Sequence, residues 1–71
     1  MRMAKCPMCG QHNVNGFKKN NKWYSTCYNK ECRYTTEVGM PTRKMSRFSW
    51  NLNYERLTGE TLPDEMTGRQ K

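Results

Sequence analysis

The amino-acid sequence predicts a small β protein that is held together by a bound metal ion rather than by a hydrophobic core. Three observations lead to this prediction. The chain has 71 residues, of which only seven are Leu, Val or Phe and none is Ile, and its formal net charge is +7. Domains of this size and polarity usually need a metal or disulfides to fold. The four cysteines stand in two close pairs, and short runs of aromatic and β-branched residues lie beside them.

The cysteine spacing is that of a tetrahedral zinc site. Cys6 and Cys9 form a C-x2-C pair, and after seventeen intervening residues Cys27 and Cys32 form a C-x4-C pair. We expect these four residues to hold one structural Zn²⁺, because a site filled by four protein ligands leaves no position for water or substrate. Two disulfides, free thiols, or His12 in place of one cysteine are the alternatives. We prefer zinc because no signal peptide or membrane span is recognisable near the start of the sequence, which predicts a reducing, cytoplasmic location.

The elements around the cysteines are predicted in order. Residues 5–10 and 28–31 should form two zinc knuckles, and Gly10 can take the positive φ that follows the second ligand. Strands are expected over residues 14–19 and 22–27, joined by an Asn-Asn turn, and over residues 33–38. Short antiparallel strands with two metal-bearing turns at one end describe a zinc ribbon, which we predict for residues 1–39.

The remainder is predicted to be a basic linker, a fourth strand and a tail. In residues 40–57, Phe48, Trp50, Leu52 and Tyr54 alternate with polar residues, so on a strand all four would line one side. This strand would pack on the ribbon or extend it. Residues 58–71 hold two glycines and Pro63 and show no periodic run. We expect this tail to be flexible and mostly disordered, with at most a brief helical turn over residues 61–67.

The positive charge is concentrated in the first fifty residues. They carry ten Lys or Arg against two acids, a net +8, whereas residues 51–71 carry −1. Basic side chains interleaved with aromatic ones predict a nucleic-acid-binding surface, since cations contact phosphates and aromatic rings stack on bases. The residues predicted to contact nucleic acid are Lys18, Lys19, Lys22, Trp23, Arg33, Tyr34, Arg43, Lys44 and Arg47.

Two other functions remain open, and enzymes are disfavoured. A single histidine, few acids and no glycine-rich phosphate loop provide no catalytic grouping, so we expect neither an enzyme nor a small-molecule substrate. A protein-binding adaptor could use the aromatic strand to extend a partner's sheet. An RNA-binding translational regulator would use the basic surface. The residues of the adaptor surface would be Phe48, Trp50, Leu52 and Tyr54, although a stripe of this kind more often forms the core.

The cysteine-bearing segments resemble two known families. Cys6–Gly10 and Cys27–Cys32, with Asn29 inside the second pair, resemble the Ogr/Delta family of bacteriophage late-transcription activators over roughly residues 5–38. That resemblance implies DNA binding and contact with RNA polymerase in a bacterial host. Residues 24–27 and 32–35 are also similar to the C-terminal zinc ribbons of type IA topoisomerases, which bind single-stranded DNA. Together these features predict a small phage-type transcription regulator that binds DNA in preference to RNA.

Overall fold

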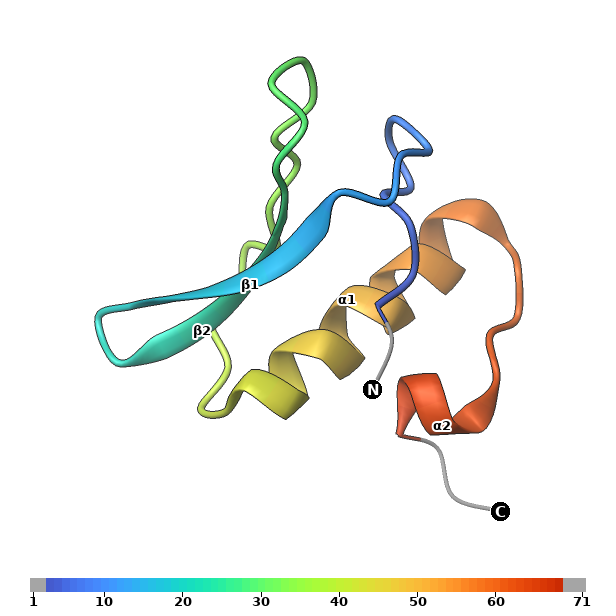
Figure 1. Cartoon of the computed structure of the whole chain (residues 1–71). Coiled ribbons are helices and arrows are strands. Elements are labelled where there is room, and N and C mark those ends of the chain that lie inside the picture. Colours follow the sequence, from blue (N-terminus) through green and yellow to red (C-terminus); the bar gives the residue numbers. More distant parts are fainter. Residues whose placement is uncertain (1–2, 69–71) are drawn as a thin grey trace.

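A two-stranded antiparallel hairpin packs on a long helix, and two loops rise from the same end of the hairpin (Figure 1). The computed structural model describes residues 3–68. Strands β1 (Val14–Lys19) and β2 (Lys22–Cys27) make the sheet. Helix α1 (Arg43–Thr58) contacts both strands, and the single-turn helix α2 (Asp64–Thr67) packs on α1. No helix among the described residues is long and apolar enough to cross a membrane.

The predicted hairpin is confirmed. Val14 faces Cys27 at the open end, and the pairing continues without interruption to the turn. Asn20 and Asn21 form this turn with φ values of 52° and 64°. A two-residue turn of this kind needs left-handed geometry at both positions, and Asn tolerates it better than most residues. The turn therefore fixes which strand residues face each other.

The predicted third strand over residues 33–38 does not form. The chain returns along β2, but only two isolated bridges join them, Thr26 with Thr35 and Trp23 with Met40. Between these bridges the returning segment has four residues where β2 has two. The surplus residues bulge away from β2, which breaks the ladder of a regular strand. The predicted ribbon of three to four strands is thus a two-stranded sheet with an irregular neighbour.

The predicted fourth strand is wrong, because its residues belong to helix α1. The Thr42 hydroxyl accepts a hydrogen bond of 3.1 Å from the amide of Met45 and caps the start of the helix. Gly59, at φ +77°, ends the helix, and its amide donates to the Glu55 carbonyl. Part of the predicted linker over residues 40–46 is consequently the first turn of α1. The alternation of aromatic and polar residues did not reflect a strand.

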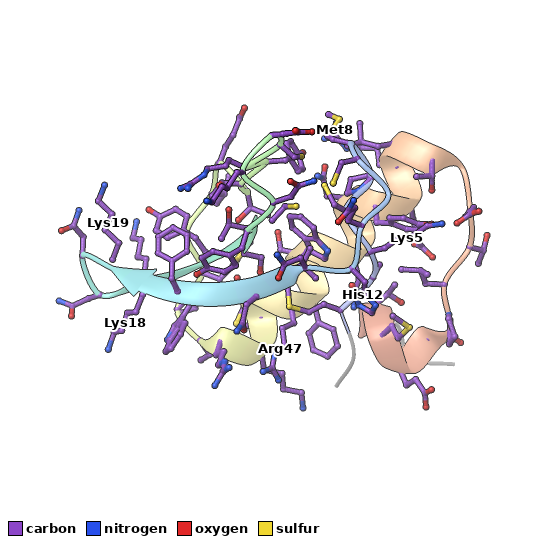
Figure 2. All side chains as sticks on the ribbon, turned by 45° about the horizontal axis from the view of Figure 1, so that its top comes forward. Lys5, Met8, His12, Lys18, Lys19 and Arg47 are labelled. Atoms are coloured by element: carbon purple, nitrogen blue, oxygen red, sulfur yellow. The ribbon has the colours of Figure 1, made fainter. Side chains whose placement is uncertain are left out.

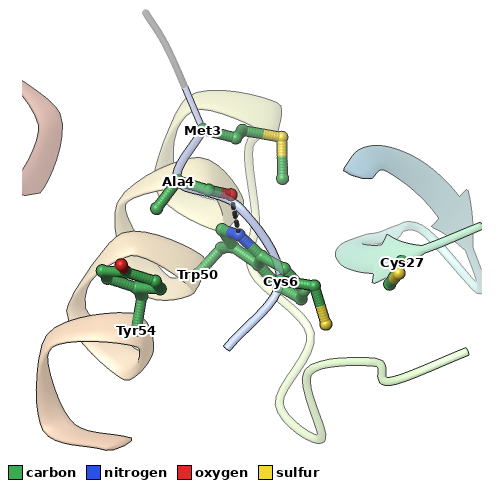
Figure 3. Close-up of a cluster of buried hydrophobic side chains, with 6 residues drawn as sticks. All are labelled: Met3, Ala4, Cys6, Cys27, Trp50 and Tyr54. Atoms are coloured by element: carbon green, nitrogen blue, oxygen red, sulfur yellow. Dashed lines mark hydrogen bonds between the residues drawn. The ribbon is translucent and has the colours of Figure 1, made fainter. Parts of the chain in front are cut away.

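The core is built on α1 rather than on the sheet alone. Trp50 is 1% exposed and Tyr54, one turn later, is 4% exposed. The Trp50 indole donates a hydrogen bond of 2.8 Å to the Ala4 carbonyl (Figure 3). On the same helix, the side-chain oxygen of Asn51 accepts a hydrogen bond of 2.7 Å from the Ala4 amide. These two bonds fix the segment that precedes Cys6 to α1, so the core joins the helix to the first cysteine pair. The buried apolar residues are Met3, Ala4, Cys6, Cys27, Trp50 and Tyr54.

The tail is ordered through Gly68, which corrects the prediction of disorder for that part. Leu62 and Met66 are half-buried against the core, and Thr67 is buried. The Asn51 amide group donates to the Met66 carbonyl, and the Tyr54 hydroxyl donates to Glu60. The short helix α2 lies within residues 61–67, where a brief helical turn was the most that the sequence predicted. The last three residues of the predicted tail, 69–71, lie outside the described residues.

Candidate metal centre

The four cysteine sulfurs lie together at the end of the hairpin away from its turn. All four Sγ atoms are within 4.8 Å of one another. The Cys6 and Cys32 sulfurs are 3.5 Å apart, and those of Cys9 and Cys27 are 3.7 Å apart. A tetrahedral zinc ion with Zn–S bonds of about 2.3 Å requires sulfur–sulfur separations of ~3.8 Å. The cysteines are therefore placed to hold a metal ion, as the spacing predicted.

A tight turn positions the first pair. The Gly10 amide donates to the Cys6 carbonyl at 2.9 Å, and the Cys6 amide donates to the Gln11 carbonyl at 3.0 Å. Gly10 has φ +75°, which confirms its predicted role after the second cysteine. These bonds close a tight turn, in which Cys6 is buried against the core and Cys9 is exposed.

A second turn positions the other pair. The amides of Cys32 and Arg33 both donate to the Asn29 carbonyl at 3.0 Å, and the Asn29 side chain accepts from the amide of Glu31. Arg33 follows its cysteine with φ +52°, the same left-handed backbone that Gly10 has in the first turn. The Cys27 amide donates to the Tyr34 carbonyl and closes the loop. Two turns with similar hydrogen bonding and the same left-handed backbone therefore lie on either side of the cysteine cluster.

Backbone amides point at every sulfur. Cys6 receives hydrogen bonds from the amides of Met8 and Cys9. Each of the other three cysteines receives one from the amide of the residue two positions later in the sequence. Amide donors stabilise thiolate charge and orient the sulfur lone pairs, as they do around bound metals. The donors to the other three sulfurs are Gln11, Asn29 and Tyr34.

The cysteine pKa values show why four thiolates need a cation. The amide of Gln11 lowers the pKa of Cys9 to about 7. Burial raises the pKa of Cys6 and of Cys27. The amide of Tyr34 lowers the pKa of Cys32, but burial and the neighbouring sulfurs of Cys6 and Cys9 raise it by more. Burial and the closeness of the sulfurs disfavour the thiolate form, and a divalent cation supplies the positive charge that four thiolates require.

Two of the alternatives, disulfide bonds and ligation by His12, find no support in the geometry. All four cysteines are free, and the closest sulfurs are much further apart than the ~2.05 Å of a disulfide bond. His12 Nε2 lies 2.7 Å from the Met3 carbonyl oxygen. Among residues 3–68, the group of side chains placed to hold a metal contains the four cysteines and no histidine.

Part of the predicted nucleic-acid surface comes together at the hairpin turn. Lys18 is the cross-strand partner of Trp23, and Lys19 is the partner of Lys22. The Arg43 guanidinium lies 5.8 Å from the centre of the Trp23 ring, which brings the start of α1 to the same place. Figure 2 shows Lys18 and Lys19 projecting at the end of the hairpin. We call Lys18, Lys19, Lys22, Trp23 and Arg43 the basic tip.

The other predicted contacts are spread over the molecule. Arg33 and Tyr34 follow the last cysteine, and the six residues of β2, which span about 17 Å, separate them from the hairpin turn. Tyr34 packs against Trp50 with ring centres 5.8 Å apart and is half-buried. It therefore serves the core. Lys44 and Arg47 lie on α1, and Arg47 is half-buried.

The predicted adaptor surface is not a single face. Trp50 and Tyr54 are buried in the core, whereas Leu52 is 44% exposed and Phe48 is half-buried. On a helix, residues two apart point in very different directions, so the four side chains separate into an inner and an outer pair. Met45 was not among the residues predicted from the sequence, although it lies beside Phe48 and Leu52. Its helical spacing from these two residues was the signal that could have identified it.

No known protein family, curated protein or solved structure matches this chain.

Proposed function

We propose that the cysteine cluster holds one structural Zn²⁺ and that the two cysteine-bearing turns are zinc knuckles. The support is the donor set itself: four sulfurs lie within 4.8 Å of one another, two pairs of them 3.5 and 3.7 Å apart, and each has at least one backbone amide aimed at it. Thiolate ligands in this arrangement suit zinc among the common intracellular metals. The site is closed, so the ion orders the chain and takes no part in chemistry.

We further propose that the protein is a nucleic-acid-binding regulator that acts through its basic tip. The observation that carries this proposal is the gathering of four cations, Lys18, Lys19, Lys22 and Arg43, around the hairpin turn. The sequence contains no acidic residue before Glu31. A projecting, uniformly basic hairpin suits the negative phosphates that line the grooves of nucleic acids.

The mechanism follows from the order of the elements. The metal fixes the open end of the hairpin, and the hairpin carries the three lysines outward. Arg43 is held over the Trp23 ring by a cation–π contact, which orients its guanidinium and covers part of that ring. We therefore assign the affinity mainly to phosphate contacts rather than to base stacking. Lys44 and Arg47 on α1 add to these contacts, and the surface favours duplex DNA.

The cellular role remains that of the sequence prediction. We propose a small phage-type regulator of transcription, for which contact with RNA polymerase is a further part of the proposal. The resemblance of the two cysteine pairs to the Ogr/Delta activators supports it. An adaptor that binds protein without nucleic acid is the rival function, and the exposed apolar residues of α1 favour it.

Salt-dependent binding tests the proposal. If about five phosphates are neutralised, the logarithm of the association constant on duplex DNA should fall against the logarithm of salt with a slope of about −4.5. Replacing Lys18, Lys19 and Lys22 together by Gln should make that slope about 2.7 smaller in magnitude, since each phosphate contact contributes ~0.9. Fluorescence anisotropy with labelled oligonucleotides measures both values.

The control uses exposed lysines outside the basic tip. The double variant Lys5→Gln with Lys30→Gln should leave the slope nearly unchanged, although its net charge also falls. Single-stranded DNA and RNA of the same sequence show whether the duplex is preferred. If the zinc-loaded protein binds none of the three at low salt, the nucleic-acid function is wrong and the adaptor function remains.

A further inference from the structure

One face of α1 is apolar and lies uncovered by the rest of the described chain. Met45 and Leu52 are 45% and 44% exposed, and they border a shallow depression of about 270 Å³. Met40 and Phe48 complete its apolar lining. We call these four residues the methionine patch. Met45, Phe48 and Leu52 follow one another at intervals of three and four residues, so they form one stripe along the helix.

One cation lies near each end of the methionine patch. The Lys44 ammonium group lies 5.8 Å from the centre of the Phe48 ring, at the border of the depression. Arg56 is exposed one turn after Leu52, where its guanidinium donates a hydrogen bond of 2.7 Å to the Asn53 side chain and lines a neighbouring depression with Glu37. The nearest acid on the helix, Glu55, accepts a hydrogen bond from the Leu62 amide and so serves the packing of the tail. A cation therefore stands near each end of the stripe, and Glu37 lies near the Arg56 end.

We propose that the methionine patch is the docking site for an acidic amphipathic segment of a partner protein. A helical segment with apolar residues at three- and four-residue spacing would lay them on Met45 and Leu52. Its carboxylates would face Lys44 and Arg56, which would set its position by charge complementarity. Methionine side chains are flexible and polarisable, so Met40 and Met45 can adapt to apolar groups of different shape.

Other occupants fit this surface less well. In a symmetric dimer built on the methionine patch, the basic borders of the two copies would approach each other, which costs free energy. Residues 69–71 contain two cations and no apolar side chain, so they cannot supply the missing partner. A nucleic acid would bring polar groups to a surface that is lined mainly by carbon and sulfur. The methionine patch adjoins the basic tip, because Met40 is bridged to Trp23 and Lys44 borders both surfaces. A protein contact there would lie beside the nucleic-acid contact proposed above.

A matched pair of leucine variants tests the proposal. Leu52 and Leu57 have the same exposed fraction, 44%, and lie on the same helix but face different directions. The probe is a synthetic amphipathic peptide with leucines along one face and glutamates elsewhere, and the protein is the full zinc-loaded chain. Leu52→Glu should weaken probe binding by at least about tenfold. Leu57→Glu should change it by less than about twofold, as expected of a surface substitution outside the contact.

Methyl NMR and two further probes complete the experiment. The Met40 and Met45 methyl signals should shift when the probe is added, while those of Met3 and Met8 should stay in place. A peptide with its leucines scrambled around the helix, or with lysine in place of glutamate, should bind far more weakly. The proposal is overturned if the acidic probe does not bind, if both leucine variants lose binding equally, or if the lysine peptide binds as well. It is also overturned if sedimentation shows a dimer that Leu52→Glu dissociates.

Discussion

Replacing Trp50 by Ala should show whether this residue belongs to the helical core or to the exposed surface that the adaptor function would require. Trp50 is 1% exposed, it contacts Tyr34, and its indole donates to the Ala4 carbonyl. Truncation of a buried Trp typically costs about 3–5 kcal/mol through the lost packing and the cavity left behind. The Ala4 carbonyl would also lose its side-chain partner in a buried place, which adds to the cost.

This loss should appear in metal affinity as well as in unfolding. In a small domain whose folding depends on its metal, the free energy of binding includes the free energy of folding. A loss of about 3–5 kcal/mol from the folded state therefore weakens apparent zinc binding by roughly 10²- to 10⁴-fold. Competition against a chromophoric chelator measures this change, and urea unfolding of the zinc-loaded protein measures the stability directly.

The control for this prediction is Leu57→Ala on the same helix. Leu57 is 44% exposed, so its truncation should change stability by less than about 0.5 kcal/mol. If Trp50→Ala weakens zinc binding no more than Leu57→Ala does, Trp50 is not part of a core that is coupled to the metal site. An unchanged stability would instead indicate that Trp50 is exposed, as the adaptor surface would require.

Three further changes test the parts of the fold around this core. The hydrogen bond to Glu60 raises the pKa of Tyr54, so this interaction stabilises the fold below pH ~10, the usual tyrosine value, and is lost as the pH rises through the raised pKa. The difference in unfolding free energy between wild type and Tyr54→Phe should therefore shrink at high pH. A difference in urea unfolding that stays constant with pH would contradict this. A Cβ at Gly39 would lie 2.7 Å from the Cβ of Lys22, so Gly39→Ala should destabilise the protein by about 1–3 kcal/mol. An unchanged urea midpoint would show that the bulge between Thr35 and Met40 moves without cost. Thr42→Ala removes the cap of α1 and should cost ~1 kcal/mol, with Thr42→Ser close to wild type; equal losses for both variants would exclude the cap as the cause.

The sequence carried enough information for the metal site and the hairpin because both depend on local spacing. The two cysteine pairs lie on short turns whose geometry is set by Gly10 and by the Asn29 carbonyl, and both turns lie next to their ligands in the sequence. The Asn20–Asn21 turn is likewise a local signal. Such features can be predicted because few distant contacts compete with them.

The second half of the chain was mispredicted because two periodicities overlap there. Phe48, Trp50, Leu52 and Tyr54 fit a period of two, but Met45, Phe48 and Leu52 fit a helix, and so do Trp50 and Tyr54. The helix carries apolar side chains on two faces, one toward the core and one outward. The sequence therefore shows no single amphipathic stripe from which the helix could be predicted. The start and stop signals at Thr42 and Gly59 were the better guide.

The order of the tail depends on contacts that no local pattern displays. Asn51 binds the backbone of Ala4 on one side and of Met66 on the other, 47 and 15 residues away in the sequence. A buried Asn in the middle of a helix looks unremarkable in a sequence, yet here it joins both ends of the chain to α1. Contacts of this kind arise only when the whole fold is assembled.

The central claim is that a metal held by four cysteines gives this chain its fold, and a zinc titration followed by circular dichroism tests it most directly. Reduced, metal-free protein should show little helix, and the signal of α1 should appear in proportion to added zinc and stop at one ion per chain. A strong chelator should then remove the signal. A metal-free protein with the full helical spectrum, unchanged by zinc, would contradict the account.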